Sequence, residues 1–377
     1  MRGEIPFDAI ATFFIFMIGL PAIVFQWLAP EIRQVVVKRW HGLVLDSGLP
    51  VLAGLLLIGV GIYLMQSETS QVRWIWPTVM SGFVVLSTVT AVRIPRKYGR
   101  RTSVVHRLER EAGRGIDRDG RPRGETLNDL MELGKYSPPG RDKEMVLQAL
   151  LNLTNRVCER ESYDGDRLAD VATGLLDVVL TTPNPGTNQN FATAAEILKR
   201  ILRAFDSRST LDGMVQVDLL HTMRAMSHLG RAAVAIDPVA MAIIQALGTT
   251  GSRHPRTTVA ASQALFEIGV RAVEHSEVLV AMSSAELLTF MVESQRESIP
   301  GPVEGEVVAD TLGLLAHFWT SGETGRDYAT ARLERVRDAM GITLADALAK
   351  TTQHCAETTE FATADLVRQM SRELEVD

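Results

Sequence analysis

The chain has 377 residues, 46% of them hydrophobic and 22% charged, and a formal net charge of −6. Residues 1–92 carry five basic and five acidic residues, residues 93–143 carry fourteen and eight, and residues 144–377 carry twenty and thirty-two, so the net charge passes from 0 to +6 to −12. The acidic last part argues against nucleic acid as a partner, because phosphate binding needs clustered Lys and Arg. The two cysteines, Cys158 and Cys355, are too few for a disulfide framework and indicate free thiols in a reducing compartment.

Three apolar stretches occupy the first part of the chain, at about residues 8–29, 48–65 and 74–92. A helix needs ~20 apolar residues to cross the ~30 Å hydrocarbon core of a bilayer. We therefore predict three transmembrane helices and a transmembrane domain over residues 1–92. The alternative for the first stretch is a cleaved signal peptide, but its apolar run is too long and no small-x-small cleavage pattern follows it cleanly.

A basic run after the third stretch predicts the orientation. It contains Arg93, Arg96, Lys97, Arg100, Arg101, Arg107 and Arg110. Lys and Arg collect on the cytoplasmic side, so we expect the N-terminus outside and the rest of the chain, beyond residue 92, in the cytoplasm. The preponderance of Arg over Lys suggests a GC-rich bacterial genome. Together with the three predicted spans, this predicts a multi-pass protein of the plasma (inner) membrane. We expect Arg93, Arg96, Lys97, Arg100 and Arg101 to bind anionic lipid headgroups of the inner leaflet.

Inside the predicted spans the notable residues are small rather than charged. We expect Gly54, Gly59 and Gly61 to allow close packing of helices, as small residues do in membranes. Ionisable residues lie only at the ends of the spans, whereas ion-coupled transporters place them inside. A monomeric transporter is therefore not expected.

Residues 93–140 are predicted to be a basic juxtamembrane connector. A short amphipathic helix is expected over residues 102–112, followed by irregular chain, because Gly113, Gly115, Gly120 and Gly124 precede the turn-forming Ser137–Gly140 segment.

From residue 141 to residue 377 the pattern is helical throughout. Apolar residues recur at i, i+3, i+4, i+7 and i+11, which lines one face of a helix, and no segment alternates with the two-residue period of a strand. The sets begin at Val146, Leu168, Ala194, Ala261 and Val308, and alternate sets start 48 and 47 residues apart. This period resembles that of HEAT and armadillo repeats. We predict an all-α chain whose cytoplasmic domain is an irregular α-solenoid, with a globular helical bundle as the alternative.

No motif for chemistry is present. The sequence lacks HExxH, GxSxG, CxxC, a paired-carboxylate motif and a phosphate-binding glycine loop. His221 and His228 are seven positions apart, which places them ~10 Å apart along a helix, too far to share one metal ion. We assign no catalytic, cofactor-binding or metal-ligating residue and expect no cofactor.

The leading hypothesis is a non-enzymatic scaffold or adaptor, in which three helices anchor a cytoplasmic helical-repeat domain that binds an unidentified protein. Anionic lipid is the other expected partner, and homo-oligomerisation is left open. The alternative is an oligomeric channel or membrane-disrupting effector gated by the cytoplasmic domain. A third hypothesis is an enzyme with an unrecognised helical active site.

Overall fold

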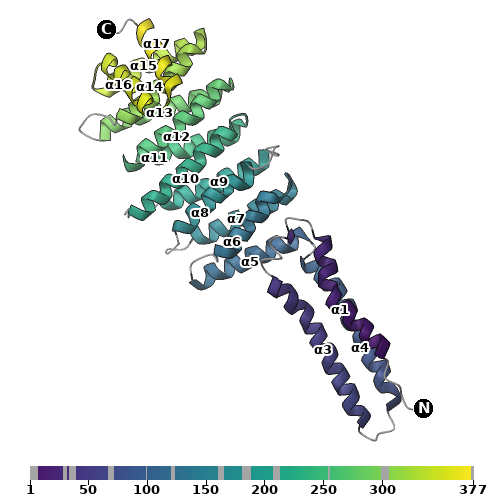
Figure 1. The fold of residues 1–377 in the computed structure, drawn as a ribbon. Helices are drawn as coiled ribbons and strands as arrows, with labels where there is room; N and C mark the ends of the chain where they lie inside the picture. The colour runs from purple at the N-terminus through teal and green to yellow at the C-terminus, as the bar shows by residue number, and fades with distance from the viewer. Residues whose placement is uncertain are drawn as a thin grey trace. The chain divides into compact units, whose positions relative to one another are not determined.

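The computed structural model describes residues 7–28, 32–33, 40–66, 72–98, 100–119, 124–159, 165–180, 188–206, 213–253, 255–298 and 305–374. Of these residues 92% are helical, in 16 helices, and none lies in a strand (Figure 1). The all-α prediction is confirmed. The chain divides into two compact units: residues 1–112 with 123–138, and residues 113–122 with 139–377.

The first unit contains a bundle of three helices. These are α1 (Phe7–Trp27), α3 (Trp40–Gln66) and α4 (Val72–Tyr98), and each packs against the other two. The core of the bundle is small, formed by Phe13 and Met17 of α1 with Val79 and Phe83 of α4. The rings of Phe13 and Phe83 stack with their centroids 4.3 Å apart.

The prediction of irregular chain after residue 112 is wrong over residues 113–119 and 124–136, which are helical, whereas the predicted turn at Ser137–Gly140 is confirmed. Helix α5 runs over Arg101–Asp119 and α6 over Gly124–Tyr136. In α5 the apolar residues Val105, Leu108, Ala112 and Ile116 share one face, and all are buried. Burial of this face outweighs the roughly 1 kcal/mol that each helical glycine costs relative to alanine.

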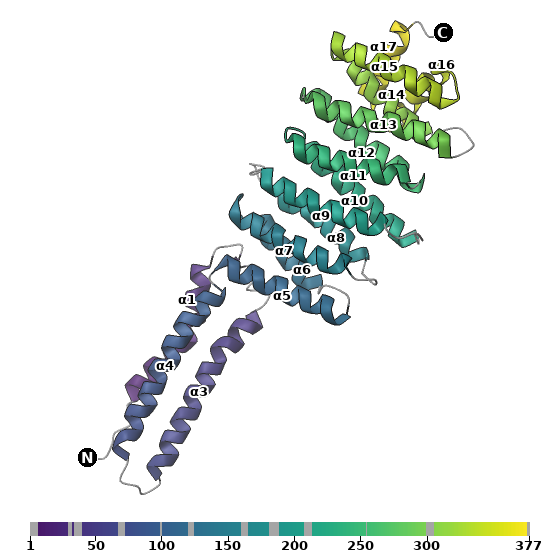
Figure 2. The ribbon, with the colours of Figure 1, turned by 180° about the vertical axis from the view of Figure 1, so that it is seen from behind.

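The second unit is a stack of helices in two layers. The odd-numbered helices α7, α9, α11, α13 and α15 contact one another in chain order, as do the even-numbered helices α8, α10, α12, α14 and α16 (Figures 1 and 2). The last helix, α17, packs on α14 and α16. The helices are α7 (Arg141–Cys158), α8 (Gly165–Leu180), α9 (Asn188–Asp206), α10 (Gly213–Ala232), α11 (Asp237–Arg253), α12 (Pro255–Glu274), α13 (Val278–Ser298), α14 (Gly305–Thr320), α15 (Glu323–Met340), α16 (Leu344–Glu357) and α17 (Phe361–Glu373).

The predicted apolar faces form the core of this stack. The five sets that begin at Val146, Leu168, Ala194, Ala261 and Val308 lie on α7, α8, α9, α12 and α14, and every member is buried. The intervals of 48 and 47 residues correspond to the step from α7 to α9 and from α12 to α14, that is, from one helix to the next in the same layer.

Small residues let the even-numbered helices approach closely. A Cβ atom added at Gly269 of α12 would lie 2.6 Å from Cδ2 of Leu314 on α14. One added at Gly230 of α10 would lie 2.5 Å from Cδ1 of Ile268 on α12. Because real Cβ atoms do not approach other heavy atoms this closely, both positions require glycine unless the neighbouring side chain moves.

Candidate functional site: the apolar bundle, its basic end and the odd-numbered face of the stack

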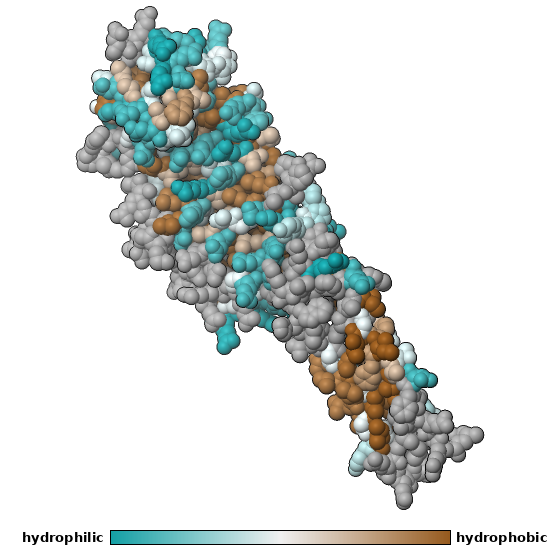
Figure 3. Space-filling model, in the orientation of Figure 1, coloured by the Kyte–Doolittle hydropathy of each residue, from teal (hydrophilic) through white to brown (hydrophobic). Residues whose placement is uncertain are grey.

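The bundle of α1, α3 and α4 exposes many of its described apolar side chains. Figure 3 shows brown, apolar surface over the first unit. Large apolar residues that are more than half exposed include Ile15, Ile18, Leu49, Leu52, Leu55, Leu56, Val60, Val84, Val85 and Val89. Contiguous apolar surface of this kind marks a membrane-facing or protein-binding region.

One helical segment of the described chain, Pro77–Ile94 in α4, is long and apolar enough to cross a membrane. The segments Ile10–Gly19 in α1 and Gly48–Tyr63 in α3 are apolar but shorter. The structure therefore contains one candidate span, and the other two predicted spans stay predictions.

The predicted lipid-binding arginines lie at the end of α4 and the start of α5. Arg93, Arg96 and Arg100 are exposed, and Arg101 is half-buried. Lys97 belongs to α4, but its side chain lies outside the described part of the structure. No described carboxylate forms an ion pair with Arg93 or Arg96.

An apolar groove between α3 and α4 ends at Arg93. Its volume is about 360 Å³, and its lining comprises Leu49, Pro50 and Ala53 from α3 with Leu86, Val89, Thr90, Arg93 and Ile94 from α4. A second, more open hollow of about 620 Å³ is lined by Thr88, Val89, Val92, Arg93 and Arg96. The two hollows share Val89 and Arg93, so we treat them as one feature, the α3–α4 groove.

The three glycines singled out in the sequence have different surroundings. A Cβ atom added at Gly54 would lie 2.6 Å from Cε1 of Phe13, so this residue lets α1 approach α3. Gly61 is buried. Gly59 is exposed, and nothing lies within 4 Å of a Cβ atom built on it. A packing role for Gly59 therefore stays a prediction about contacts outside the single chain.

One face of the stack combines a basic groove with exposed apolar side chains. A groove of about 360 Å³ lies between α9 and α11, lined by Lys199, Leu202 and Arg203 of α9 and by Ala242, Gln245, Ala246, Thr249 and Thr250 of α11. On the neighbouring helix α13, Leu279, Ser283, Glu286 and Phe290 follow the spacing i, i+4, i+7 and i+11, which places them on one side of the helix. Leu279 and Phe290 are 66% and 48% exposed.

These residues lie on helices of one layer, because α9, α11 and α13 contact one another in chain order, while α12 of the other layer packs against α13. We call this surface the odd-numbered face. It consists of Lys199, Arg203, Ala242, Gln245, Ala246, Thr249, Leu279, Ser283 and Phe290.

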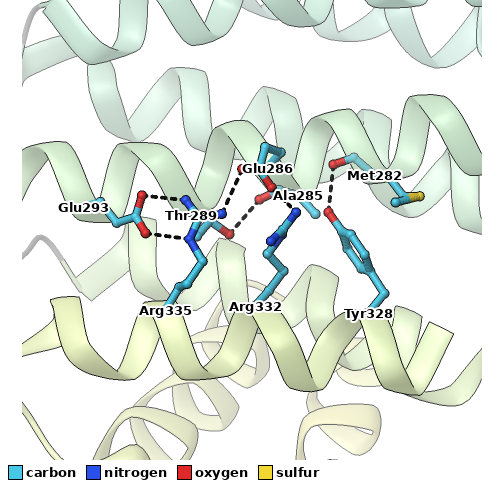
Figure 4. Close-up of polar contacts among 8 residues, drawn as sticks. All are labelled: Met282, Ala285, Glu286, Thr289, Glu293, Tyr328, Arg332 and Arg335. Carbon is cyan, nitrogen blue, oxygen red and sulfur yellow. Dashed lines mark hydrogen bonds and ion pairs between the residues drawn. The ribbon is translucent and has the colours of Figure 1, made fainter. Parts of the chain in front are cut away.

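A set of ion pairs joins α13 to α15 beside this face (Figure 4). The Arg335 guanidinium donates to both Glu293 carboxylate oxygens, at 2.8 and 2.7 Å, and to Oε1 of Glu286 at 2.8 Å. Arg332 pairs with the other Glu286 oxygen at 2.5 Å. The hydroxyl of Tyr328 donates to the backbone carbonyl of Met282 at 3.0 Å. The hydrogen bonds that Arg335 donates to Glu293 and then to Glu286 hold its pKa above the ordinary value. Because each of these charged groups is paired with an opposite charge on the other helix, we interpret the set as structural. We call these ion pairs of Glu286 and Glu293 with Arg332 and Arg335 the clamp.

A buried carboxyl group lies in the interior of the stack. Asp310 of α14 accepts a hydrogen bond of 2.6 Å from the Ser262 hydroxyl of α12. Burial raises the pKa of Asp310 to about 8, and the nearby carboxylates of Glu360, Glu306 and Glu267 act in the same direction. Sequence reasoning missed this residue, although an acidic residue inside the apolar run of residues 307–319 was a usable signal.

The pKa values of a buried thiol and a partly buried imidazole nearby are shifted toward favouring the uncharged forms. Burial raises the pKa of Cys355 to about 12 and lowers that of His317, whose Nε2 lies 3.2 Å from the Thr363 hydroxyl. Cys158 and Cys355 are both free thiols. In the described part of the chain no three His, Cys, Asp or Glu residues are placed to hold a metal ion, and His221 and His228 are exposed on α10.

Comparison with known proteins gives no relative. No protein-family model, no curated protein and no solved structure matches the chain.

Proposed function

We propose that the chain is an integral membrane protein in which the bundle of α1, α3 and α4 anchors a cytoplasmic, α-solenoid-like stack that binds another protein. The observation that carries the proposal is the exposed apolar surface of the bundle, with a span-length apolar segment in α4. Exposing so many large aliphatic side chains to water is unfavourable by about 25 cal/mol per Å², whereas lipid accepts them.

The odd-numbered face supports the binding role. Stacked helix pairs characteristically bind partners along extended surfaces. Here Leu279 and Phe290 of α13 are exposed in the same layer as a groove whose α11 wall includes the small residues Ala242 and Ala246. Exposed aromatic and aliphatic anchors beside a pocket are the usual centre of a protein interface. Arg203 at the groove suits a partner with acidic residues, whereas the Lys199 ammonium already pairs with Glu196 at 3.1 Å.

The proposed topology has the N-terminus outside and the stack in the cytoplasm, with the anionic inner leaflet at the basic end of α4. It is tested by reporter fusions after residue 377. A reporter that works only in the cytoplasm should be active there. Activity of a reporter that works only outside would reject the orientation.

Protein binding is tested by placing a photo-crosslinking amino acid at position 290 or at position 217 in living cells. Phe290 and Val217 are about equally exposed, at 48% and 51%, but Val217 lies on α10 of the other layer. We expect a discrete crosslinked product from position 290 and a much weaker one from position 217. Phe290→Asp should abolish the cellular role at normal protein abundance, and Val217→Asp should preserve it. Equal behaviour of the two positions would contradict a binding role for this face.

The alternative, an oligomeric channel, is favoured by one feature. Gly59 lies in a shallow apolar hollow of about 560 Å³ on α3, lined also by Leu52, Leu55, Leu56, Val60 and Tyr63, to which no other described helix contributes. A second copy could pack there through the glycine. If the protein is a channel, Gly59→Leu should abolish its conductance in liposomes. If it is a scaffold, the variant should still bind its partner.

A further inference from the structure

We propose that the α3–α4 groove holds one anionic phospholipid, with its phosphate on Arg93 and Arg96 and an acyl chain along α3 and α4. The inference rests on the proposed insertion of the bundle in a membrane. It goes beyond a general attraction of the basic run to lipid, because it assigns one lipid to one groove.

The position of the groove fixes which part of a lipid would lie where. The apolar segment of α4 ends at Ile94, which sets the boundary between hydrocarbon and headgroups. Leu49, Pro50 and Ala53 of α3 and Leu86 and Val89 of α4 line the groove within the apolar zone. Arg93 and Arg96 lie at the boundary, which is where the phosphate of a phospholipid lies.

The two arginines are arranged to bind the same anion. They are three residues apart on α4, hence neighbours on the helix surface, and both line the same hollow. Both are exposed, and no described carboxylate pairs with either. A guanidinium group offers paired donors that match phosphate oxygens, so two such groups suit one phosphate.

The groove and the arginines should contribute differently to binding. A lipid chain in a bilayer is already in an apolar medium, so entering the groove brings it little hydrophobic gain. The groove therefore selects lipids by the shape of the acyl chain. The preference for an anionic over a zwitterionic headgroup must come from Arg93 and Arg96. Each basic residue near an anionic headgroup should change the affinity about fivefold.

The experiment uses the full chain purified in mild detergent and titrated by native mass spectrometry with phosphatidylglycerol or phosphatidylcholine of identical acyl chains. We expect one phosphatidylglycerol to bind at least tenfold more tightly than phosphatidylcholine. The double change Arg93→Gln with Arg96→Gln should weaken the binding of phosphatidylglycerol about thirtyfold. Ala53→Phe, which fills the groove, should weaken the binding of both lipids. Matched controls are Arg110→Gln with Arg114→Gln, which removes two exposed arginines of α5, and Leu52→Phe on the exposed side of α3.

Three outcomes would overturn the site. Equal affinity for the two lipids would remove the role of the arginines. Equal losses of phosphatidylglycerol affinity in the double variant and its control would show diffuse electrostatic attraction instead of a site. Release of the wild-type protein from membranes by alkaline carbonate would reject the proposed insertion itself, and the site with it. Retention in the membrane with equal lipid affinities rejects the site alone.

Discussion

Asp310 is a residue whose environment in the fold differs strongly from that in an unfolded chain. In the fold it is enclosed between α12 and α14 and accepts the Ser262 hydroxyl, and burial raises its pKa to about 8 from an ordinary value of 3.8. The fold therefore binds this proton more tightly than the unfolded chain does. The associated stability is fully present below about pH 4 and is lost as the pH rises through about 8.

We expect Asp310→Asn to remove part of this pH dependence. Between the two pKa values one such group changes the free energy of unfolding by at most about 1.4 kcal/mol per pH unit. In urea unfolding at pH 5, 7 and 9, the wild type should lose stability with rising pH more steeply than the Asn variant. Asp338→Asn on α15 is the matched control, because the Asp338 side chain is 77% exposed. The stability of this variant should depend on pH as that of the wild type does. Parallel curves for the wild type and Asp310→Asn would contradict the buried, protonated carboxyl.

At the scale of single elements, the helices of the stack were predictable because their apolar faces are regular. All five predicted sets are buried. The second half of α5 and the whole of α6 were missed because glycines and a Ser-Pro-Pro-Gly segment signal irregular chain, while the buried face of α5 stabilises the helix through packing. The clamp between α13 and α15 could not be predicted, since Glu293 and Arg335 are 42 residues apart and only the layer arrangement brings them together.

The clamp should stabilise the contact of α13 with α15 modestly. Arg335 is partly exposed, so solvent screens its pairs with Glu286 and Glu293. We expect Arg335→Gln to lower the free energy of unfolding by about 1 kcal/mol. In a double-mutant cycle with Glu293→Gln, the coupling should shrink in 1 M salt. Arg337→Gln, an exposed arginine of the same helix, should change stability by less than about 0.5 kcal/mol. A coupling near zero at low salt would show that the clamp contributes nothing.

At the scale of the whole molecule, we expect the second unit to fold without the bundle. A fragment of residues 139–377 contains nearly all of this unit, and a chain of that length buries roughly 70–75% of its surface on folding. Circular dichroism of the fragment should show a helical protein with little strand. Failure of the fragment to fold would mean that the stack depends on the preceding helices.

The arrangement of contacts in the stack leads to a sharper prediction. Among the described helices, the main contacts of each helix from α7 to α13 are with helices one or two places away along the chain, as in repeat proteins whose stability is a sum of local terms. Leu265 is fully buried in α12, so Leu265→Asp places an unpaired charge in the apolar interior at a cost of several kcal/mol (order of magnitude). We expect hydrogen exchange to show lost protection from α10 to α14, whereas α7 and α8 keep theirs. Gln263→Asp, at an exposed position two residues away, should leave protection unchanged throughout. Uniform loss of protection in Leu265→Asp would instead identify a single cooperative globular bundle, because in such a bundle damage at one helix spreads to all of them.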